Sequence, residues 1–240
     1  MFYKLKAVLL FYRYFGLLQL IQFVYQKLIN KELLTIRSKA LGGKVFIRRS
    51  SSDFSVLIQM IEEMNNFELE TDPDLIIDGG ANIGLSVRYF REKFSNAEIQ
   101  GYEPDPGNYE CAERNCQMLE GVTLLNQGLW SSRCHLTLKN PEALPWAYQF
   151  EKSERKKEGS IEAISLNDIF LEIQSDRTIL VKLDVEGAEK ELILSQNQWL
   201  KKVKWVLVEI HGPIELFDRE MQKNGFSIKR YGEKQLYTKI

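Results

Sequence analysis

A chain of 240 residues, 44% of them hydrophobic and 27% charged, is long enough to bury the core of one sizeable α/β domain with additional N-terminal elements. Its formal net charge of −1 excludes the strong global field with which a basic protein recruits nucleic acid. The cysteines Cys111, Cys116 and Cys134 lack CxxC spacing, which argues against a disulfide framework or a zinc site and favours a reducing, cytoplasmic compartment.

Residues 1–32 predict an N-terminal amphipathic helix. Leu, Ile, Phe and Tyr dominate this segment, but Arg13 and three glutamines interrupt the apolar run before it reaches the roughly 20 residues of a membrane-spanning helix. The glutamines share one helical face: Gln19, Gln22 and Gln26. The segment lacks the small-residue cleavage site of a signal peptide. Two interpretations stay open: a helix packed on the domain or on a second subunit as a homodimer contact, and a peripheral helix lying in the plane of a membrane.

Residues 33–72 are expected to form a small hairpin and a helix. Thr35–Arg37 and Val45–Arg48 resemble two short strands joined through two glycines. Ser52-Asp53 is expected to cap a helix that runs to about Met64, because the apolar positions repeat at helical spacing.

From residue 73 the pattern changes to alternating strands and helices, which predicts a domain over residues 73–240. Apolar runs flanked by helices indicate strands buried on both faces of a mainly parallel sheet. The expected strands are Leu75–Asp78, Glu98–Glu103, Val122–Gln127, Thr178–Asp184 and Val203–Ile210, and the first two helices are Gly84–Phe94 and Asn108–Leu119. Phe226–Tyr231 and Gln235–Ile240 predict a terminal hairpin. The expected fold is therefore an α/β, Rossmann-like, doubly wound sheet with a C-terminal antiparallel hairpin.

The stretch Asn140–Ser160 fits no regular element. It holds two prolines, Trp146 and Tyr148, and the charge cluster Lys152–Glu158. A loop of this length in a compact domain is typically either solvated or a binding lid. We expect a solvated loop, and a lid that places the two aromatic residues over a substrate stays an alternative.

The segment Asp78–Gly84, with the sequence DGGANIG, predicts the cofactor site. A strand that ends in an acid, followed by a glycine-rich turn and a helix, is the architecture that holds an adenosine-containing cofactor. Glu103 ends the second strand nineteen residues beyond Gly84 and could accept hydrogen bonds from both ribose hydroxyls.

The charge at this turn distinguishes two classes of cofactor. The glycines at 79, 80 and 84 do not form the GxGxxG pattern that holds a pyrophosphate. A carboxylate at Asp78 would repel a pyrophosphate and attract the ammonium and sulfonium groups of S-adenosylmethionine. The turn therefore favours S-adenosylmethionine over a nicotinamide cofactor.

Five motifs, in this order, resemble the successive motifs of the FkbM-type methyltransferases: Asp78–Gly84, Tyr102–Pro106, Ile164–Asp168, Lys182–Glu189 and Val208–His211. The resemblance covers roughly residues 45–211, and the block KLDVEGAE at Lys182–Glu189 is its most specific part. Gln127–Trp130 and Asn167 depart from the family pattern. The resemblance implies S-adenosylmethionine-dependent O-methylation, of a sugar hydroxyl in a glycan or polysaccharide, or of a natural product.

The resemblance also implies roles for individual residues of the cofactor site. Asp78, Gly80, Asn82 and Gly84 would line the methionine end of S-adenosylmethionine. Glu103 would hold the ribose. Asp105 would lie on the adenine side.

Charged residues follow the strand Thr178–Asp184. Alkyl transfer from a sulfonium mainly requires that the acceptor is positioned and loses its proton. Groups that do this are expected at the carboxyl ends of parallel strands. Lys182, Asp184 and Glu186 occupy such an end, and alternation places them on one side of the strand. We take these three residues as catalytic candidates.

The strand Val203–Ile210 brings two more such residues. Alternation places Glu209 and His211 on one side of it. His211 is a fourth catalytic candidate and a candidate general base, because an imidazole with an ordinary pKa of about 6.5 suits neutral pH. Asp184 is the alternative base, or it orients the acceptor hydroxyl.

Two other interpretations of this cluster stay open. An ion-pair network joining Lys182 to Asp184 or Glu209 would hold the sheet edge without chemistry. A divalent cation on Asp184, Glu209 and His211 would acidify the acceptor hydroxyl, and such ligands favour Mg²⁺ or Mn²⁺. The remaining histidine, His135, is expected to be structural or exposed.

Three function hypotheses result. The leading one is an O-methyltransferase whose acceptor is a sugar or another small molecule. The second is a nicotinamide-dependent oxidoreductase, which the glycine spacing and Asp78 oppose. The third is a non-catalytic, cofactor-binding module that docks into a glycan assembly complex through its N-terminal helix.

Overall fold

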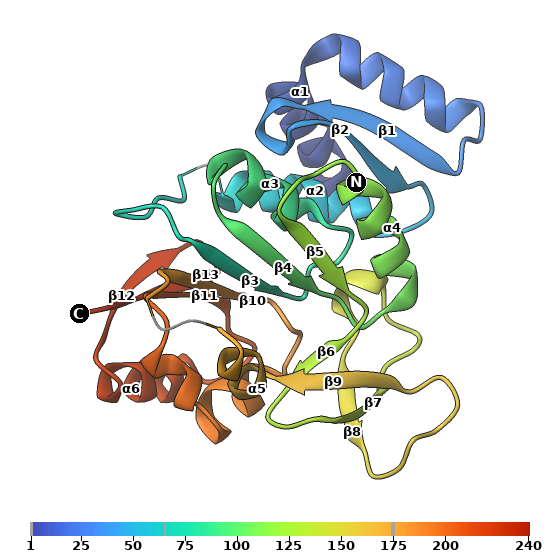
Figure 1. Cartoon of the computed structure of the whole chain (residues 1–240). Helices are drawn as coiled ribbons and strands as arrows, with labels where there is room; N and C mark the ends of the chain where they lie inside the picture. The colour runs from blue at the N-terminus through green and yellow to red at the C-terminus, as the bar shows by residue number, and fades with distance from the viewer. Residues whose placement is uncertain (1, 65, 174–175) are drawn as a thin grey trace.

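A seven-stranded sheet forms the centre of the computed structural model, which describes residues 2–64, 66–173 and 176–240 (Figure 1). The strand order is β12-β13-β11-β10-β3-β4-β5. Strands β11 to β5 pair in parallel, whereas β13 pairs antiparallel with β11 and β12. The strands are β3 (Leu75–Gly79), β4 (Glu98–Tyr102), β5 (Val122–Leu125), β10 (Ile179–Leu183), β11 (Trp205–Glu209), β12 (Phe226–Tyr231) and β13 (Lys234–Lys239). The predicted doubly wound sheet with a C-terminal antiparallel hairpin is confirmed.

Helices cover both faces of this sheet, which explains the uninterrupted apolar sequences of its central strands. Ile76 and Leu180 face the layer that contains α2 and α3, whereas Ile77 and Val181 face the layer that contains α5 and α6 (Figure 1). Short helical turns at Lys190–Ser195 and Gln198–Lys201 extend the second layer. The helices are α2 (Asp53–Met64), α3 (Leu85–Lys93), α4 (Pro106–Cys116), α5 (Leu166–Leu171) and α6 (Ile214–Lys223).

The predicted N-terminal hairpin is also confirmed. It consists of β1 (Leu33–Ser38) and β2 (Gly43–Arg48), which pair antiparallel. Asp53, expected to cap α2, instead forms an ion pair with Arg48 at 2.8 Å. Its carboxylate also accepts a hydrogen bond from the Arg48 backbone amide at 2.7 Å, so Asp53 joins the hairpin to the start of α2.

The N-terminal helix α1 (Phe2–Leu28) lies along β1. Gly16, with φ of 78°, interrupts its helical backbone. Of the predicted polar face, Gln22 is exposed, whereas Gln19 and Gln26 turn towards the protein and hydrogen-bond to the backbone of β1. These side chains satisfy backbone groups that an edge strand otherwise leaves unpaired.

A second, four-stranded sheet corrects the prediction for residues 140–160. Its strands follow the order β6-β9-β7-β8. The stretch expected to be irregular contains a helical turn at Pro145–Ala147 and the strand β8. β8 lies at the sheet edge, and its sequence FEKS shows no apolar alternation that would predict a strand. The strands are β6 (Gly128–Trp130), β7 (Cys134–Leu138), β8 (Phe150–Ser153) and β9 (Ile161–Ser165).

Several element ends differ from the prediction by a few residues. The strand expected over Val122–Gln127 ends at Leu125, because the Asn126 side chain turns back to donate to the carbonyls of Glu103 and Pro104. Other ends differ by one to three residues, as is common at frayed termini. The cysteines on α4 are buried free thiols, and the third is partly buried and free: Cys111, Cys116 and Cys134.

Candidate active site

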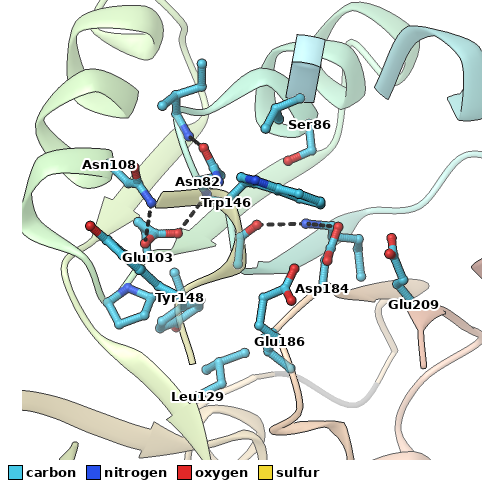
Figure 2. A pocket seen from close by; sticks show the side chains of 18 of the residues that line it. Asn82, Ser86, Glu103, Asn108, Leu129, Trp146, Tyr148, Asp184, Glu186 and Glu209 are labelled. Carbon is cyan, nitrogen blue, oxygen red and sulfur yellow. Dashed lines mark hydrogen bonds and ion pairs between the residues drawn. The ribbon is translucent and has the colours of Figure 1, made fainter. Parts of the chain in front are cut away.

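A pocket opens at the carboxyl ends of the parallel strands, where the turns after β3, β4 and β10 meet (Figure 2). Helix α2 and the residues 145–150 complete its wall. Figure 2 shows Glu103, Asn108 and Tyr148 at one end of the pocket and Asp184 and Glu209 at the other. This position follows from the topology, because open α/β sheets bind ligands where their parallel strands end.

The glycine turn forms the central wall of this pocket. Gly80 and Asn82 both have positive φ, of 76° and 49°. A Cβ atom on Gly80 would lie 1.8 Å from the carbonyl oxygen of Asp184, so only glycine lets the end of β10 approach so closely. Gly80, Ala81, Asn82 and Ile83 all line the pocket.

Glu103 is held in a fixed orientation at one end of the pocket. Its Oε2 accepts a hydrogen bond from the Asn82 amide at 2.8 Å, and its Oε1 accepts one from the Asp105 amide at 2.9 Å. Burial raises the pKa of the Glu103 carboxyl to about 7, although these two amides partly offset the effect. Oε1 also accepts a longer hydrogen bond from the Asn108 side chain, at 3.4 Å, whereas Oε2 keeps a lone pair for a hydroxyl donor.

Two residues assigned to cofactor binding lie outside the pocket wall. Asp105 caps α4 and accepts a hydrogen bond from the Asn108 amide at 2.7 Å. Gly84 lets α3 pack closely on α4, because a Cβ atom there would lie 2.9 Å from the Cys116 sulfur. Both residues therefore stabilise the elements around the pocket without lining it.

Asp78 is fully buried and paired, and it also does not line the pocket. Its Oδ1 lies 3.0 Å from the Lys182 ammonium and forms an ion pair with it, although that oxygen accepts no aligned hydrogen bond. Its Oδ2 accepts a hydrogen bond from the Ser86 hydroxyl. The Lys182 ammonium also donates to the Gly80 carbonyl at 2.8 Å. Asp78 therefore cannot act on a ligand as the unpaired carboxylate that the sequence suggested, and Lys182, a catalytic candidate, holds the glycine turn.

A buried lysine that the sequence pattern did not reveal joins the other end of the pocket. The Lys234 ammonium lies 3.0 Å from Glu63 and 3.2 Å from Asp184, and it forms a short hydrogen bond to Glu209. Burial alone would raise the pKa of Asp184, but Lys234 and Lys182 more than offset it and lower that pKa below its ordinary value. Lys234 could have been identified as a site residue from the pairing of β13 with β11, which places it directly opposite Glu209.

This lysine also corrects the expectation of a divalent cation. The ammonium of Lys234 occupies the space between Asp184 and Glu209, two of the three expected ligands. Among residues 2–64, 66–173 and 176–240, no group of three His, Cys, Asp or Glu side chains is arranged to hold a metal ion. The carboxylates are neutralised by a side chain of the protein itself.

His211 is surrounded by acids. Its Nδ1 lies 3.1 Å from Glu189, and its Nε2 lies 3.5 Å from Glu186 and 3.8 Å from Glu209. The hydrogen bond to Glu189 and the neighbouring carboxylates raise the pKa of His211 to about 9, against the opposing effect of burial. An imidazolium at neutral pH cannot accept a proton, so the structure contradicts the expectation that His211 is the general base.

Glu186 faces the pocket in an unusual backbone conformation. Its φ of 48° is rare for a residue with a Cβ atom and is typical of functional sites. Burial raises the pKa of Glu186 to about 7, although His211 acts to lower it. A carboxylate with a pKa near neutrality is a suitable general base.

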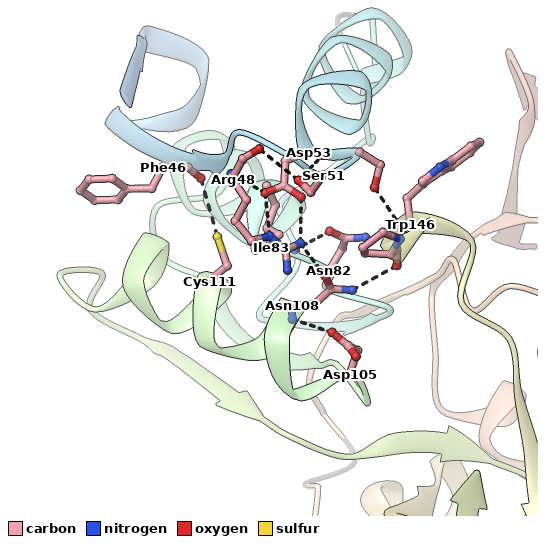
Figure 3. Close-up of polar contacts among 12 residues, drawn as sticks. Phe46, Arg48, Ser51, Asp53, Asn82, Ile83, Asp105, Asn108, Cys111 and Trp146 are labelled. Atoms are coloured by element: carbon pink, nitrogen blue, oxygen red, sulfur yellow. Dashed lines mark hydrogen bonds and ion pairs between the residues drawn. The ribbon is translucent and has the colours of Figure 1, made fainter. Parts of the chain in front are cut away.

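An aromatic segment covers the pocket between its two ends. Trp146, Tyr148 and Phe150 line the wall. The Trp146 amide donates to the Ser52 hydroxyl at 3.3 Å, and Asn108 donates to the Pro145 carbonyl at 3.2 Å, so the segment is fastened at two points (Figure 3). The aromatic residues of the expected loop thus lie over the pocket, as the lid interpretation requires.

Arg48 connects the N-terminal hairpin to this segment. Figure 3 shows its guanidinium between Asp53 and Asn108, and it donates a hydrogen bond to the Asn108 side chain at 2.7 Å. Asn108 in turn contacts Glu103 at 3.4 Å. The hairpin therefore supports the cofactor end of the pocket through two side chains.

The other residues noted in the sequence lie apart from this chemistry. Asn167, a departure from the family pattern, accepts a hydrogen bond from the Trp199 amide at 2.8 Å and holds a helical turn. Leu129 and Trp130, from the other departure, line the pocket. His135 is partly exposed on β7, as expected.

Comparisons with known proteins show the family to which the chain belongs. Residues 78–228 match the Methyltransferase FkbM domain. Methyltransferase sdnD of Sordaria araneosa is 31% identical over 193 residues, which cover 65% of this chain and 74% of that protein. Hexuronic acid methyltransferase AglP of Haloferax volcanii is 28% identical over 149 residues, 62% of this chain and 60% of AglP. A methyltransferase structure from Pyrococcus furiosus, 13% identical, aligns with a TM-score of 0.45 over 92% of this chain and 98% of its own. The chain belongs to the FkbM family of methyltransferases.

Proposed function

We propose that this methyltransferase transfers a methyl group from S-adenosylmethionine to a hydroxyl of a sugar in a glycan or polysaccharide. The observation that carries the proposal is Glu186, a pocket carboxylate with a pKa raised to about 7, opposite an aromatic segment that covers the same pocket. Methylation of a hydroxyl needs such a base, because an alcohol is a weak acid.

The residues at the Glu103 end fit the adenosine part of S-adenosylmethionine. The Glu103 carboxylate is fixed by two backbone amides, and its Oε2 can accept a hydrogen bond from a ribose hydroxyl. Pro104, Leu129 and Tyr148 provide flat or apolar walls for a purine ring beside it. Backbone groups at Gly80–Ile83 line the path towards Asp184.

The residues at the other end fit the methyl-transfer step. S-adenosylmethionine supplies a methyl group activated by a sulfonium. Glu186 takes the proton of the acceptor hydroxyl as the oxygen of that hydroxyl gains the methyl group, whose bond to sulfur breaks to leave S-adenosylhomocysteine. Asp184, kept ionised by Lys234 and Lys182, accepts a hydrogen bond from the acceptor and orients it. His211, as a cation, keeps Glu186 in place.

Two observations support a sugar as the acceptor. Trp146 can stack on the apolar face of a sugar ring, while carboxylates accept hydrogen bonds from its hydroxyls. One relative, AglP, is named a hexuronic acid methyltransferase. A small natural product with a flat ring and a hydroxyl is the alternative acceptor.

The test combines cofactor titration with an acceptor panel. We expect the purified chain to bind S-adenosylhomocysteine and not NAD by calorimetry, because the glycine turn lacks the GxGxxG pattern that holds a pyrophosphate and the Lys182 ammonium beside it is already paired with Asp78. Transfer of labelled methyl from S-adenosylmethionine is then measured on neutral glycosides, uronic acid glycosides and hydroxylated aromatic products. Methylation of a glycoside supports the proposal. Methylation of aromatic products alone overturns the sugar assignment, and S-adenosylhomocysteine binding without transfer favours a non-catalytic module.

A further inference from the structure

Helix α1 turns Gln19 and Gln26 towards the protein and leaves many of its large apolar side chains exposed. Gln26 exchanges two hydrogen bonds with Thr35 of β1, at 2.8 and 3.0 Å, and Gln19 donates to Arg37 at 3.1 Å. Phe11 is buried against the domain. A surface helix of a soluble protein normally has the opposite arrangement, with its polar face in water.

Six large apolar side chains are strongly exposed along α1, and we call them the outer face. Between 56% and 79% of each of these side chains is exposed: Leu9, Leu17, Leu18, Ile21, Tyr25 and Leu28. Scattered apolar residues on a surface need no explanation, but six on one helix indicate a contact site.

The charge around this face is strongly positive although the whole chain is nearly neutral. Residues 1–49 contain ten Lys or Arg and one acid, Glu32, a net charge of +9. The remaining residues contain 22 Lys or Arg and 32 Asp or Glu, a net charge of −10. The exposed basic residues beside α1 include Lys31, Arg37, Lys39, Lys44 and Arg49. Figure 1 shows α1, β1 and β2 together at one end of the molecule.

This charge decides which partner fits the outer face. A second copy of the chain would bring another positively charged N-terminal surface against the first, which like-charge repulsion opposes. A surface of anionic lipid attracts the same lysines and arginines and offers an apolar layer to the outer face.

The contacts of α1 also decide its orientation. Contrary to the expectation from its interrupted apolar run, the segment Val8–Leu28 is long and apolar enough to cross a membrane by length and composition. However, Gly16 breaks the helix, and Gln19 and Gln26 tie its second half lengthwise to β1. Phe23 also stacks on Phe54 of α2, with ring centroids 5.0 Å apart. A spanning orientation would separate all these contacts.

We propose that the protein binds an anionic membrane surface through α1 lying in the membrane plane. The outer face enters the boundary between headgroups and acyl chains, and the basic residues of the β1–β2 hairpin contact anionic headgroups. The pocket stays in water on the other side of α2, whose residues Val56, Gln59 and Met60 line it.

Sedimentation with lipid vesicles tests this proposal on the full chain. We expect binding to vesicles of phosphatidylcholine with one quarter phosphatidylglycerol, and about tenfold weaker binding to phosphatidylcholine alone or in 0.5 M salt. Leu18→Glu should weaken binding to the anionic vesicles by about tenfold or more. Leu171→Glu is the matched control, because Leu18 and Leu171 are both 79% exposed and Leu171 lies on α5.

A second pair of variants tests the charge. K31E/K39E should weaken vesicle binding, whereas K156E/K157E, the same charge change at exposed sites elsewhere, should not. S-adenosylhomocysteine affinity, unchanged in all four, shows that the variants fold. Absence of binding to anionic vesicles, or equal loss in Leu18→Glu and Leu171→Glu, overturns the proposal. The proposal is also overturned if the protein forms a dimer in solution that Leu18→Glu dissociates. It is overturned as well if the protein binds an RNA duplex more tightly than vesicles and Leu18→Glu leaves that RNA binding intact.

Discussion

Lys182 and Asp78 lie directly opposite each other on β10 and β3, and their charged groups are 3.0 Å apart in the buried centre of the sheet. The same ammonium donates to the Gly80 carbonyl. One lysine therefore both neutralises the acid at the head of the glycine turn and fixes the turn itself.

Removing this lysine should destabilise the fold. Lys182→Met leaves the Asp78 carboxylate buried without its cation, and we expect the free energy of unfolding to fall by about 3–5 kcal/mol. Denaturant titration measures it, with Lys156→Met as an exposed control expected to change stability by about 0.5 kcal/mol or less. The double variant D78N/K182M should lose less than the sum of the single variants, and strict additivity would show that the pair does not interact.

Glu103→Gln should weaken binding of S-adenosylhomocysteine by about tenfold to a hundredfold, the usual value of hydrogen bonds to a charged group. Because the pKa of Glu103 is raised to about 7, its carboxylate forms as pH rises through 7, and the affinity of the wild type should rise between pH 6 and 8. Calorimetry at several pH values measures both effects. Asp105→Asn is the control, since Asp105 caps α4 outside the pocket, and an equal loss of affinity there would contradict the assignment.

Glu186→Gln should lower kcat by about a hundredfold to ten-thousandfold and leave S-adenosylhomocysteine affinity unchanged, because it removes the base alone. With the pKa of Glu186 at about 7, the wild-type rate should increase with pH and level off above about 7. Glu215→Gln, an exposed acid on α6, is the matched control. A variant that keeps the wild-type rate and pH profile would refute Glu186 as the base.

His211 should stabilise the folded protein in a pH-dependent way. The pKa of His211 is raised to about 9 in the folded protein, so its contribution is complete below the unfolded value of about 6.5 and is lost as pH rises through about 9. His211→Gln should therefore reduce the free energy of unfolding more at pH 6 than at pH 9.5. Urea titrations of both proteins at the two pH values measure this difference, and a deficit that grows with pH would contradict the raised pKa.

Trp146→Ala should raise the KM for a glycoside acceptor by about tenfold or more, since it removes a large apolar contact. Affinity for S-adenosylhomocysteine should change little. Trp146→Phe keeps an aromatic ring and should restore most of the acceptor affinity in steady-state kinetics. A loss of cofactor affinity equal to the loss of acceptor affinity would place Trp146 on the cofactor instead.

The sheet and the N-terminal hairpin could be predicted because their signals are local. Apolar runs, glycine turns and helical periodicity each occupy a few neighbouring residues, as in Leu75–Asp78 and the terminal hairpin. The strand β8 escaped prediction because it is a charged edge strand, stabilised by pairing with β7 rather than by its own pattern.

The candidate site also contains one part that the sequence predicted and one part that it did not. The glycine turn, Glu103 and the acids after β10 follow from the sequence, because strand order brings strand ends together. The charge state of each acid does not, because it depends on which distant cation lies beside it. Lys234 reaches Asp184 from 50 residues away, and Lys182 reaches Asp78 from the neighbouring strand.

The sequence by itself determined the fold class, the family and the edge of the sheet at which the chemistry occurs, since these depend on short patterns and strand order. Only the tertiary structure decided that Lys234 lies between Asp184 and Glu209, that acids surround His211, and that Gln19 and Gln26 of α1 face inward. Burial and Coulomb interaction decide these properties, and both depend on the distances between side chains rather than on their order in the chain.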